Sequence, residues 1–442
     1  MTIQNTAKEY RSQAKHSSPT KVAVASFIGT SIEWFDFFLY GTASALVFGK
    51  LFFPTDDPLM GTLLAFGSFG VGFAARPIGG AVFGNLADKV GRKNTLVITL
   101  LIMGIATACI GLLPTHGQIG IAAPLLLVFL RLVQGFGVGG EWGAAVLMAV
   151  EHAPETKKGF FGSIPQMGAP AGTLMATGSF ALLTLLPEED FLSWGWRLPF
   201  LASFVLVIIG LIIRVSLTES PEFQNVAQTG RIKKTPVLSA VRDHWRVILI
   251  SAGIRFSENS VFYVVTVFAI TYGVDALGLE RGPMLNAVLI CSAIELALIP
   301  LFGRMSERFG HRRLFLIAAM GSVAVAFPFF MLLNTGNFFI ITGAMTICIA
   351  LAAVMYALEP AIMGSLFPAE VRTSAVSLGY QVASVFAGGL SPFIAAGLYA
   401  WSGRQWWPIA TYLMVMGLIT FVSAHFATKH AATLKEQATQ EM

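Results

Sequence analysis

Long apolar runs alternate with short polar segments along this 442-residue chain. A helix needs about 20 apolar residues to cross roughly 30 Å of hydrocarbon, and twelve runs reach that length. The pattern therefore predicts an all-α, polytopic membrane protein with twelve transmembrane helices. We expect them near residues 22–48, 61–83, 95–113, 122–150, 160–186, 198–217, 245–272, 283–302, 314–333, 338–366, 373–400 and 406–427.

A polar stretch between the second and third runs recurs half a chain later. The first copy, residues 84–93, reads GNLADKVGRK, and the second, residues 303–313, reads GRMSERFGHRR. Both place glycine, acid, base, glycine and a basic pair in the same order, 219 residues apart. Two glycines seven residues apart permit a sharp reversal, so we expect each stretch to form a tight turn. The repeat indicates two similar membrane halves in tandem.

The longest polar interruption, residues 218–244, separates these halves. It predicts a linker, with a solvated tether as its plainest interpretation. The expected organisation is a tail (1–21), a six-helix bundle (22–217), the linker, a second six-helix bundle (245–427) and a tail (428–442). Lysine and arginine concentrate in the amino-terminal tail, the linker and every second loop. By the positive-inside rule both termini are cytoplasmic, and we expect a bacterial inner-membrane protein.

Composition narrows the classes of protein further. Hydrophobic residues make up 55% of the chain and charged residues 12%, against about 25% charged in soluble domains, which excludes a soluble protein. The net charge is +5, but no basic stripe lies on a soluble face, so we expect the lipid bilayer and no nucleic acid as partner. Cys109, Cys291 and Cys348 lie inside apolar runs at unrelated spacings and predict neither a disulfide nor a metal site.

Two acidic residues lie in the middle of the first predicted helix. An ionisable group inside the membrane costs about 2.5–3.5 kcal/mol, so each one needs a reason. Glu33 and Asp36 are three residues apart and therefore share a helix face. Two such carboxyl groups in low dielectric predict a proton-binding site. The alternative is that a fixed arginine neutralises both and they serve packing.

Basic residues lie at similar depth in both halves. Arg131 is near the middle of the fourth predicted helix and Arg255 near the middle of the seventh, with Glu258 one turn later. Guanidinium groups bind carboxylates through paired hydrogen bonds, which predicts an anionic substrate between the halves at mid-membrane. An ion pair that fixes helix position is the alternative for Arg255 and Glu258. Arg76 adds a further buried cation.

Neutral polar side chains near the same depth are candidate substrate contacts. Each has hydrogen bonding between helices as its plain alternative. They are Tyr40, Gln134, Gln166, Asn259, Tyr380 and Gln381.

Two motifs carry a resemblance to a known family. The turn G-x-x-x-D-x-x-G-R-K resembles the signature loop of the major facilitator superfamily, and R-x-x-Q-G-x-G-x-G from Arg131 resembles its fourth-helix motif. The resemblance implies that family's fold of two six-helix bundles and alternating access. It also implies that Asp88 faces the amino end of the eleventh helix near Thr373 and Ser374. The implied gating residues are Gly84, Asp88, Gly91, Arg92, Glu307 and Arg308, and the expected proton-coupling residues are Glu33, Asp36, Arg131, Glu141 and Glu258.

Further segments narrow the resemblance to the metabolite:proton symporter family. They read SIEWFDFFLYG (31–41), FAARPIGG (73–80), GGEWG (139–143) and SWGWRLPF (193–200). The segment GYQVASV (379–385) is similar to the shikimate-permease branch. The resemblance implies proton-coupled uptake of a small organic acid by a monomer, driven by the proton gradient without a cofactor.

Other functions stay open at this point. Uptake of a zwitterionic osmolyte is one alternative, and a proton-linked exporter is another. A membrane enzyme or receptor needs a clustered catalytic or metal set, whereas the histidines are scattered. A channel is disfavoured because the tandem repeat and the buried carboxylates suit alternating access.

Overall fold

Helices that cross the membrane make up almost the whole protein, whose computed structural model describes residues 18–56, 58–229, 233 and 235–440. Within these residues there is no β-strand, so the all-α prediction is confirmed. Ten helices of the described part are long and apolar enough to span a membrane. The long helix α4 and the α8–α9 pair bring the set to the twelve that the sequence predicts.

The elements follow one another in the order of the predicted spans, with short helical turns at the loops. Their bounds are α2 Pro19–Ala43, η1 Ser44–Phe48, α3 Gly49–Leu51, α4 Pro58–Val90, α5 Arg92–Leu112, α6 His116–Ile119, α7 Ala122–His152, η2 Glu155–Lys157, α8 Lys158–Gln166, α9 Gly168–Leu183, α10 Glu188–Asp190, η3 Phe191–Gly195, α11 Arg197–Val215, α12 Pro221–Gln228, α13 Pro236–Tyr263, η4 Val264–Phe268, α14 Ala269–Asp275, α15 Arg281–Phe309, α16 His311–Leu333, α17 Phe338–Gly364, α18 Arg372–Ala383, η5 Ser384–Gly389, α19 Ser391–Trp401 and α20 Trp407–Gln440.

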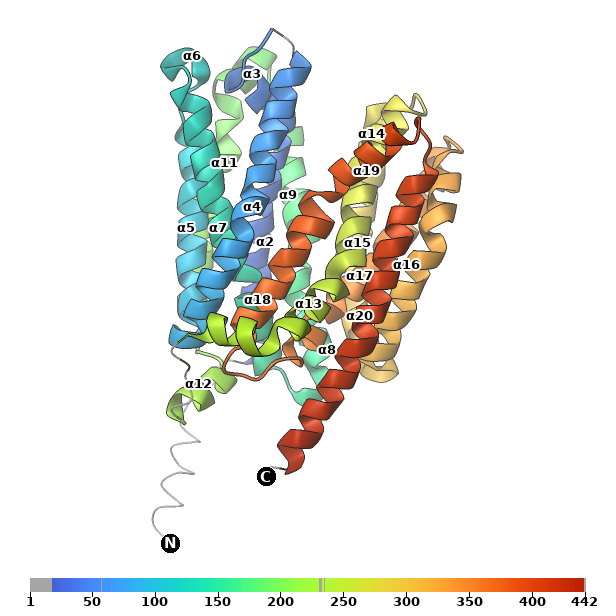
Figure 1. The fold of residues 1–442 in the computed structure, drawn as a ribbon. Helices are drawn as coiled ribbons and strands as arrows, with labels where there is room; N and C mark the ends of the chain where they lie inside the picture. Colours follow the sequence, from blue (N-terminus) through green and yellow to red (C-terminus); the bar gives the residue numbers. More distant parts are fainter. Residues whose placement is uncertain (1–17, 57, 230–232, 234, 441–442) are drawn as a thin grey trace.

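Two groups of helices stand side by side (Figure 1). The elements from α2 to α11 form the amino half, and those from α13 to α20 form the carboxy half. Helix α2 begins and α20 ends at the same end of the bundle, which we call the terminal end. The two groups meet there and diverge toward the opposite end (Figure 1).

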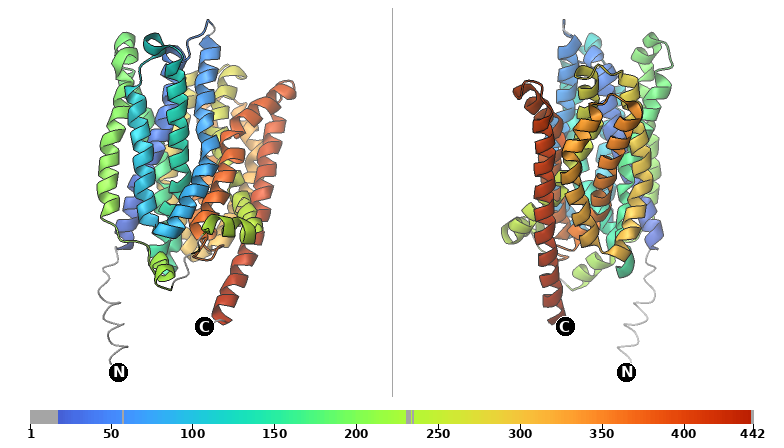
Figure 2. Two further views of the ribbon diagram at one scale, coloured as in Figure 1. Left: turned by 60° about the vertical axis from the view of Figure 1, so that its left-hand side comes forward. Right: turned by 90° about the vertical axis from the view of Figure 1, so that its right-hand side faces the viewer.

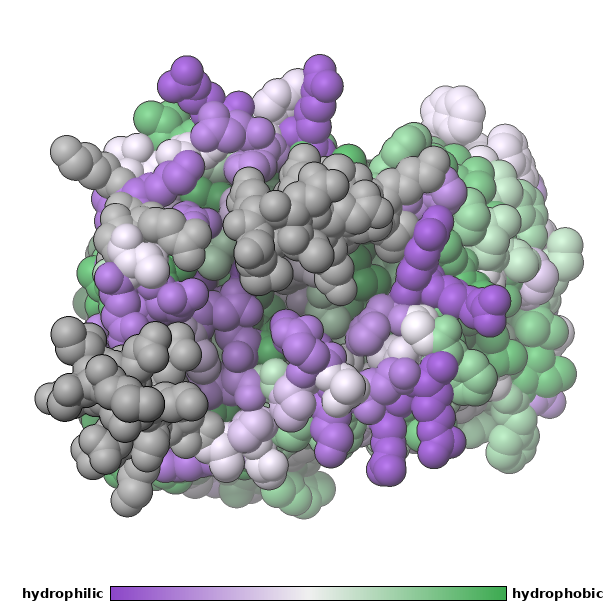
Figure 3. Space-filling model, turned by 90° about the horizontal axis from the view of Figure 1, so that it is seen from below, coloured by the Kyte–Doolittle hydropathy of each residue, from purple (hydrophilic) through white to green (hydrophobic). Residues whose placement is uncertain are grey.

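The outer flank of the bundle is apolar. Large side chains such as Val205 and Ile317 are more than half exposed on it, while many polar and charged side chains are buried between the helices. Hydrophilic residues gather on the terminal end (Figure 3). This distribution suits a protein surrounded by lipid, because hydrocarbon solvates apolar surface and excludes charge.

The predicted turn at residues 84–93 is shorter than we expected. Helix α4 continues through Gly84 and Asp88 to Val90, and the chain reverses only at Gly91, where φ is +104°. The second copy behaves alike, since α15 continues to Phe309 and Gly310 has φ of +84°. Residues with a side chain rarely adopt this conformation, so the second glycine of each copy makes the turn.

Gly84 therefore lies inside helix α4 and not in the turn predicted for it. A Cβ atom at Gly84 would lie 2.8 Å from Cα of Ser374, so the glycine permits close approach of α4 and α18. These helices belong to different halves. The prediction that the turn begins at Gly84 was wrong. The glycine is tolerated inside α4 because α18 packs against it, and the helix ends only at Val90.

The interruptions within helices repeat in the two halves. The π-helical turn η1 begins at Ser44 and η4 begins at Val264, 220 residues later. The fifth span is interrupted at Met167, between α8 and α9. The eleventh span is interrupted at the corresponding place by η5, Ser384–Gly389, between α18 and α19. The internal repeat therefore extends beyond the two turns to the bends of the spanning helices. Broken helices of this kind surround the substrate site in many transporter folds.

The segment between the halves contains two helical pieces. Helix α12 lies at the terminal end and buries Phe223 and Val226. Helix α13 begins at Pro236, within the predicted linker, and bends at His244, whose φ of −128° is not helical. The predicted span at 245–272 begins just after this bend. Helix α20 continues past its apolar part and extends beyond the bundle (Figure 2).

Candidate functional site

Aromatic and aliphatic side chains from both halves meet in one buried cluster, which we call the central cluster. It contains Trp34, Phe37 and Phe73 from the amino half, with Tyr263, Ile299 and Tyr356 from the carboxy half. The rings of Phe73 and Tyr263 lie 6.1 Å apart in an edge-to-face arrangement. The halves thus meet through apolar contacts, and buried charged groups lie next to them.

Two guanidinium groups beside this cluster lie against aromatic rings and not in ion pairs with described residues. Arg131 of α7 lies over the rings of Phe37 and Tyr40, with 4.8 Å and 4.4 Å from Cζ to the ring centroids. Arg76 of α4 lies 4.4 Å from the centroids of both Phe37 and Phe73. Neither arginine forms an ion pair with a carboxylate of the described residues, although both are at most 4% exposed.

Several N–H groups of these arginines also have no hydrogen-bond acceptor in the described structure. They are Nε of Arg76 and both Nε and Nη2 of Arg131. Aromatic faces stabilise a cation but accept no strong hydrogen bond. Because buried charges are normally paired, two such groups near one ring are suited to receive an anion.

A chain of hydrogen bonds connects Arg131 to Asp36. Nη1 of Arg131 donates to Gln134 Oε1 at 3.1 Å, Gln134 Nε2 donates to Thr107 Oγ1 at 2.6 Å, and Thr107 Oγ1 donates to Asp36 Oδ2 at 2.8 Å. Ser203 donates to the other oxygen of Asp36 at 2.5 Å. Asp36 is therefore held within the amino half, between α5 and α11, and is coupled to the arginine through two neutral side chains.

Glu33 and Glu141 differ in their partners. The Oε2 atom of Glu33 is buried and accepts no hydrogen bond from the described residues. Glu141 is ion-paired with Arg214 of α11 and accepts a hydrogen bond from Thr99 at 3.4 Å. Glu141 thus has a cationic partner in an ion pair, whereas Glu33, one turn before Asp36, forms no ion pair with a described residue.

Arg255 in the carboxy half is already paired, as the alternative interpretation allowed. Its Nη1 atom lies 2.8 Å from Glu359 Oε2 and 3.4 Å from Glu258 Oε2. Its Cζ atom lies 3.5 Å from the ring centroid of Tyr380. A substrate anion would compete with two carboxylates for Arg255, which distinguishes it from Arg131.

Most predicted neutral contacts bond to other helices in this state. Gln166 accepts from Trp142 and donates to the carbonyl of Tyr356 at 2.8 Å, and Gln381 donates to the carbonyl of Gly139 at 2.9 Å. The bonds to the carbonyls of Tyr356 and Gly139 join the two halves, as does the stacking of Trp142 on Tyr380 at 3.7 Å. Within single halves, Tyr40 bonds Ser68 at 2.7 Å and Asn259 donates to Ala383 at 3.4 Å.

The contact predicted for Asp88 is present at the terminal end. Its two carboxylate oxygens accept hydrogen bonds from the backbone N–H groups of Thr373 and Ser374, at 3.2 and 2.8 Å, and Ser374 Oγ donates a third at 2.8 Å. An anion at the start of a helix is favoured by the helix dipole, by about 0.3–1 kcal/mol. Asp88 thereby fastens α4 to the start of α18 across the halves.

Further charges extend this contact. Arg92 lies 3.3 Å from Glu151, which also lies 3.3 Å from Arg372 of the carboxy half. Arg372 is ion-paired with Glu222 of α12 as well. Glu219 accepts from the backbone N–H groups at the start of α5, and burial raises its pKa while these donors act in the opposite direction.

The second copy of the turn makes a similar contact with one difference. Glu307 accepts a hydrogen bond from the backbone N–H of Phe160 at 3.1 Å, at the start of α8 in the other half. Asp88 and Glu307 thus hold corresponding positions in the repeat. Arg308, predicted to act in gating, instead lies exposed and makes no ion pair with a described residue.

Comparison with known proteins identifies the family. Residues 26–392 match the model of the Major Facilitator Superfamily. The chain belongs to this superfamily. It is 43% identical over 413 residues to the shikimate transporter of Escherichia coli K12, covering 92% of this chain and 94% of that protein. It is 42% identical to the inner membrane metabolite transport protein YhjE of the same strain, over 92% and 93% of the two chains.

A solved structure shows the same fold. The proton:xylose symporter XylE, bound to 6-bromo-6-deoxy-D-glucose, matches with a TM-score of 0.75 over 94% of this chain and 96% of that one, at 16% identity. The family match and the two relatives confirm the family resemblance seen in the motifs. The protein is a multi-pass membrane transporter of small molecules and not an enzyme.

Three residues that contact the candidate site's carboxyl groups were not predicted from the sequence. Thr107 and Ser203 are ordinary polar residues in apolar helices, and only the folded structure shows that both donate to Asp36. Arg214 lies near the end of its helix and resembles a boundary residue until its bond to Glu141 is seen. The available signal was that a buried acid in the membrane requires a partner.

Proposed function

We propose that the protein is a proton-coupled symporter that takes up a small organic acid, such as shikimate or another carboxylate, by alternating access. The observation that carries the proposal is the pair of unpaired guanidinium groups, Arg76 and Arg131, beside the central cluster. A substrate carboxylate would supply the missing acceptors through charge-assisted hydrogen bonds. The relatives described above, one of them a shikimate transporter, support a metabolite of this size.

Proton binding is assigned to the acidic groups beside this site. Asp36 is joined to Arg131 through Thr107 and Gln134, so a change at the arginine reaches the carboxyl group through three hydrogen bonds. Glu33 is buried nearby without a described hydrogen-bond partner for Oε2. A carboxylate in such surroundings is stabilised by taking up a proton. A proton that enters down the membrane potential gains about 2.3 kcal/mol per 100 mV. The proton gradient would therefore drive accumulation without a cofactor.

The structure represents one state of the proposed cycle. The cross-half hydrogen bonds and ion pairs of the described residues all lie between the site and the terminal end. The positive-inside rule places this end and both termini in the cytoplasm of a bacterial inner membrane. With that orientation, these contacts close the cytoplasmic side of the proposed site. We assign function to the monomer, since one chain contains both halves of the site.

Uptake into proteoliposomes tests this function. We expect labelled shikimate to accumulate under an inward proton gradient and a protonophore to abolish accumulation. Unlabelled monocarboxylates should compete, because they can occupy the two arginines, whereas betaine should compete at least tenfold less well. Competition by betaine equal to that by carboxylates, or accumulation unaffected by the protonophore, would contradict the proposal.

A further inference from the structure

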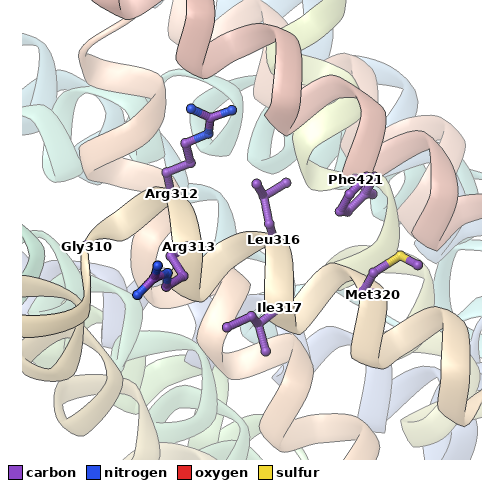
Figure 4. A pocket seen from close by; sticks show the side chains of 7 residues that line it. All are labelled: Gly310, Arg312, Arg313, Leu316, Ile317, Met320 and Phe421. Atoms are coloured by element: carbon purple, nitrogen blue, oxygen red, sulfur yellow. The ribbon is translucent and has the colours of Figure 1, made fainter.

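An open groove lies on the outer surface of the carboxy half, far from the central cluster. It runs between the beginning of α16 and the neighbouring part of α20 and has a volume of about 580 Å³. Its lining residues are Gly310, Arg312, Arg313, Leu316, Ile317, Met320 and Phe421. Figure 4 shows Leu316, Met320 and Phe421 along the groove and both arginines at its terminal end.

The charge at that end of the groove is one-sided. Arg304, Arg308, Arg312 and Arg313 are all exposed within ten residues of sequence. The one acid among them, Glu307, is engaged by the N–H group of Phe160. No described carboxylate lies within ion-pair distance of the four arginines. A basic patch therefore borders an apolar channel at the surface of a membrane protein.

The corresponding positions of the amino half show that this charge is not required by the turn itself. There, Lys93 corresponds to Arg312 and Asn94 to Arg313. Nζ of Lys93 donates to the carbonyl of Val215 at 2.7 Å, and Nδ2 of Asn94 donates to the carbonyl of Val90 at 3.1 Å. Arg92, which corresponds to His311, is buried against Glu151. The basic side chains of the first copy thus bond within the protein. Arg312 and Arg313 of the second copy have no such described partner and extend outward (Figure 4).

We propose that this groove binds an anionic glycerophospholipid, with its phosphate on Arg312 and Arg313 and an acyl chain along Leu316, Met320 and Phe421. The terminal end of the span is where a headgroup and the first methylenes of its chain would lie. Lysine and arginine at this level attract anionic lipid electrostatically. The apolar lining stabilises the bound lipid further in proportion to the chain surface that it covers. A zwitterionic lipid gains the second contribution but little of the first.

Native mass spectrometry of the detergent-solubilised protein with added dioleoyl phosphatidylglycerol or phosphatidylcholine tests the proposal. We expect one tightly bound phosphatidylglycerol and at least tenfold weaker binding of phosphatidylcholine. Binding of phosphatidylglycerol should fall at least tenfold in R312Q/R313Q and persist in R312K/R313K. The matched control K157Q/R242Q removes two exposed charges from the same end and should bind as the wild type does.

A second variant tests the contribution of the apolar groove to lipid binding separately from that of the two arginines. Leu316→Trp fills the groove while keeping both arginines, and we expect it to weaken phosphatidylglycerol binding severalfold. It also tests the proposal should the double glutamine variant fail to fold. Equal lipid binding by R312Q/R313Q and the control, or by Leu316→Trp and the wild type, would overturn the proposal. Displacement of the lipid by equimolar glycerol phosphate would instead indicate a site for soluble anions and would also overturn it.

Discussion

The two arginines beside Phe37 differ from Arg255 in what surrounds them. Arg255 is satisfied by two carboxylates, so its charge fixes α13 against α17. Arg76 and Arg131 lie on aromatic rings and keep unsatisfied N–H groups. In a low-dielectric site an unsatisfied cation costs free energy that an anionic ligand recovers. The specificity for an anion is therefore expected to reside in the amino half.

Substitution of Arg131 tests this assignment. We expect Arg131→Gln to weaken substrate binding about 10- to 100-fold, because a hydrogen bond to a charged group contributes about 1.5–3 kcal/mol. Arg131→Lys should recover only part of the affinity, since an ammonium group lacks the planar pair of donors. Equilibrium binding to purified protein measures the effect. Arg246→Gln, an exposed arginine over Trp245, is the control and should bind normally. Unchanged affinity in Arg131→Gln would remove this residue from the site.

Helix α4 contacts α18 of the other half, and this contact depends on close packing at Gly84. Close approach to α18 at Gly84 brings Asp88 within reach of Thr373 and Ser374. The contact joins the two halves, so weakening it should favour the state in which the terminal end is open. Asp88→Asn removes the charge, and Gly84→Ala prevents the approach.

We expect both variants to transport severalfold more slowly with little change in substrate affinity. Hydrogen exchange at the amides of Thr373 and Ser374 should be faster, since Gly84→Ala moves them away from their acceptor and Asp88→Asn leaves one oxygen for the two N–H groups. Gly67→Ala is a matched control in the same helix, because a Cβ atom there meets nothing within 4 Å. A large loss of affinity with normal turnover in Asp88→Asn would count against the gating role.

The same helix shows what the sequence could and could not predict. Apolar runs and the 219-residue repeat gave the number of spans and the two halves, because membrane insertion depends on local hydrophobicity. The exact turn was missed, since glycine is tolerated inside a helix when a neighbour needs the space, as at Gly84. The ion pair between Arg214 and Glu141 was also missed. It depends on how two distant helices pack, and no local sequence pattern predicts that packing.

At the scale of the whole molecule, the proposed site lies where the two halves meet. The hydrogen bonds across the halves lie on one side of that site, and the helix breaks recur at matching positions in each half. Such an arrangement allows the halves to rock about the central cluster while substrate and proton stay bound. Coupling requires that transport of the solute depend on the state of the buried acids.

Simultaneous measurement of substrate entry and proton movement in proteoliposomes tests this central claim most directly. Without an imposed gradient, addition of the carboxylate substrate should make the external medium more alkaline as substrate enters. Asp36→Asn, which keeps the size of the side chain and whose amide oxygen can still accept from one of Thr107 and Ser203, should exchange substrate but move no protons. Substrate entry without proton movement in the wild type, or acidification of the medium, would contradict the account.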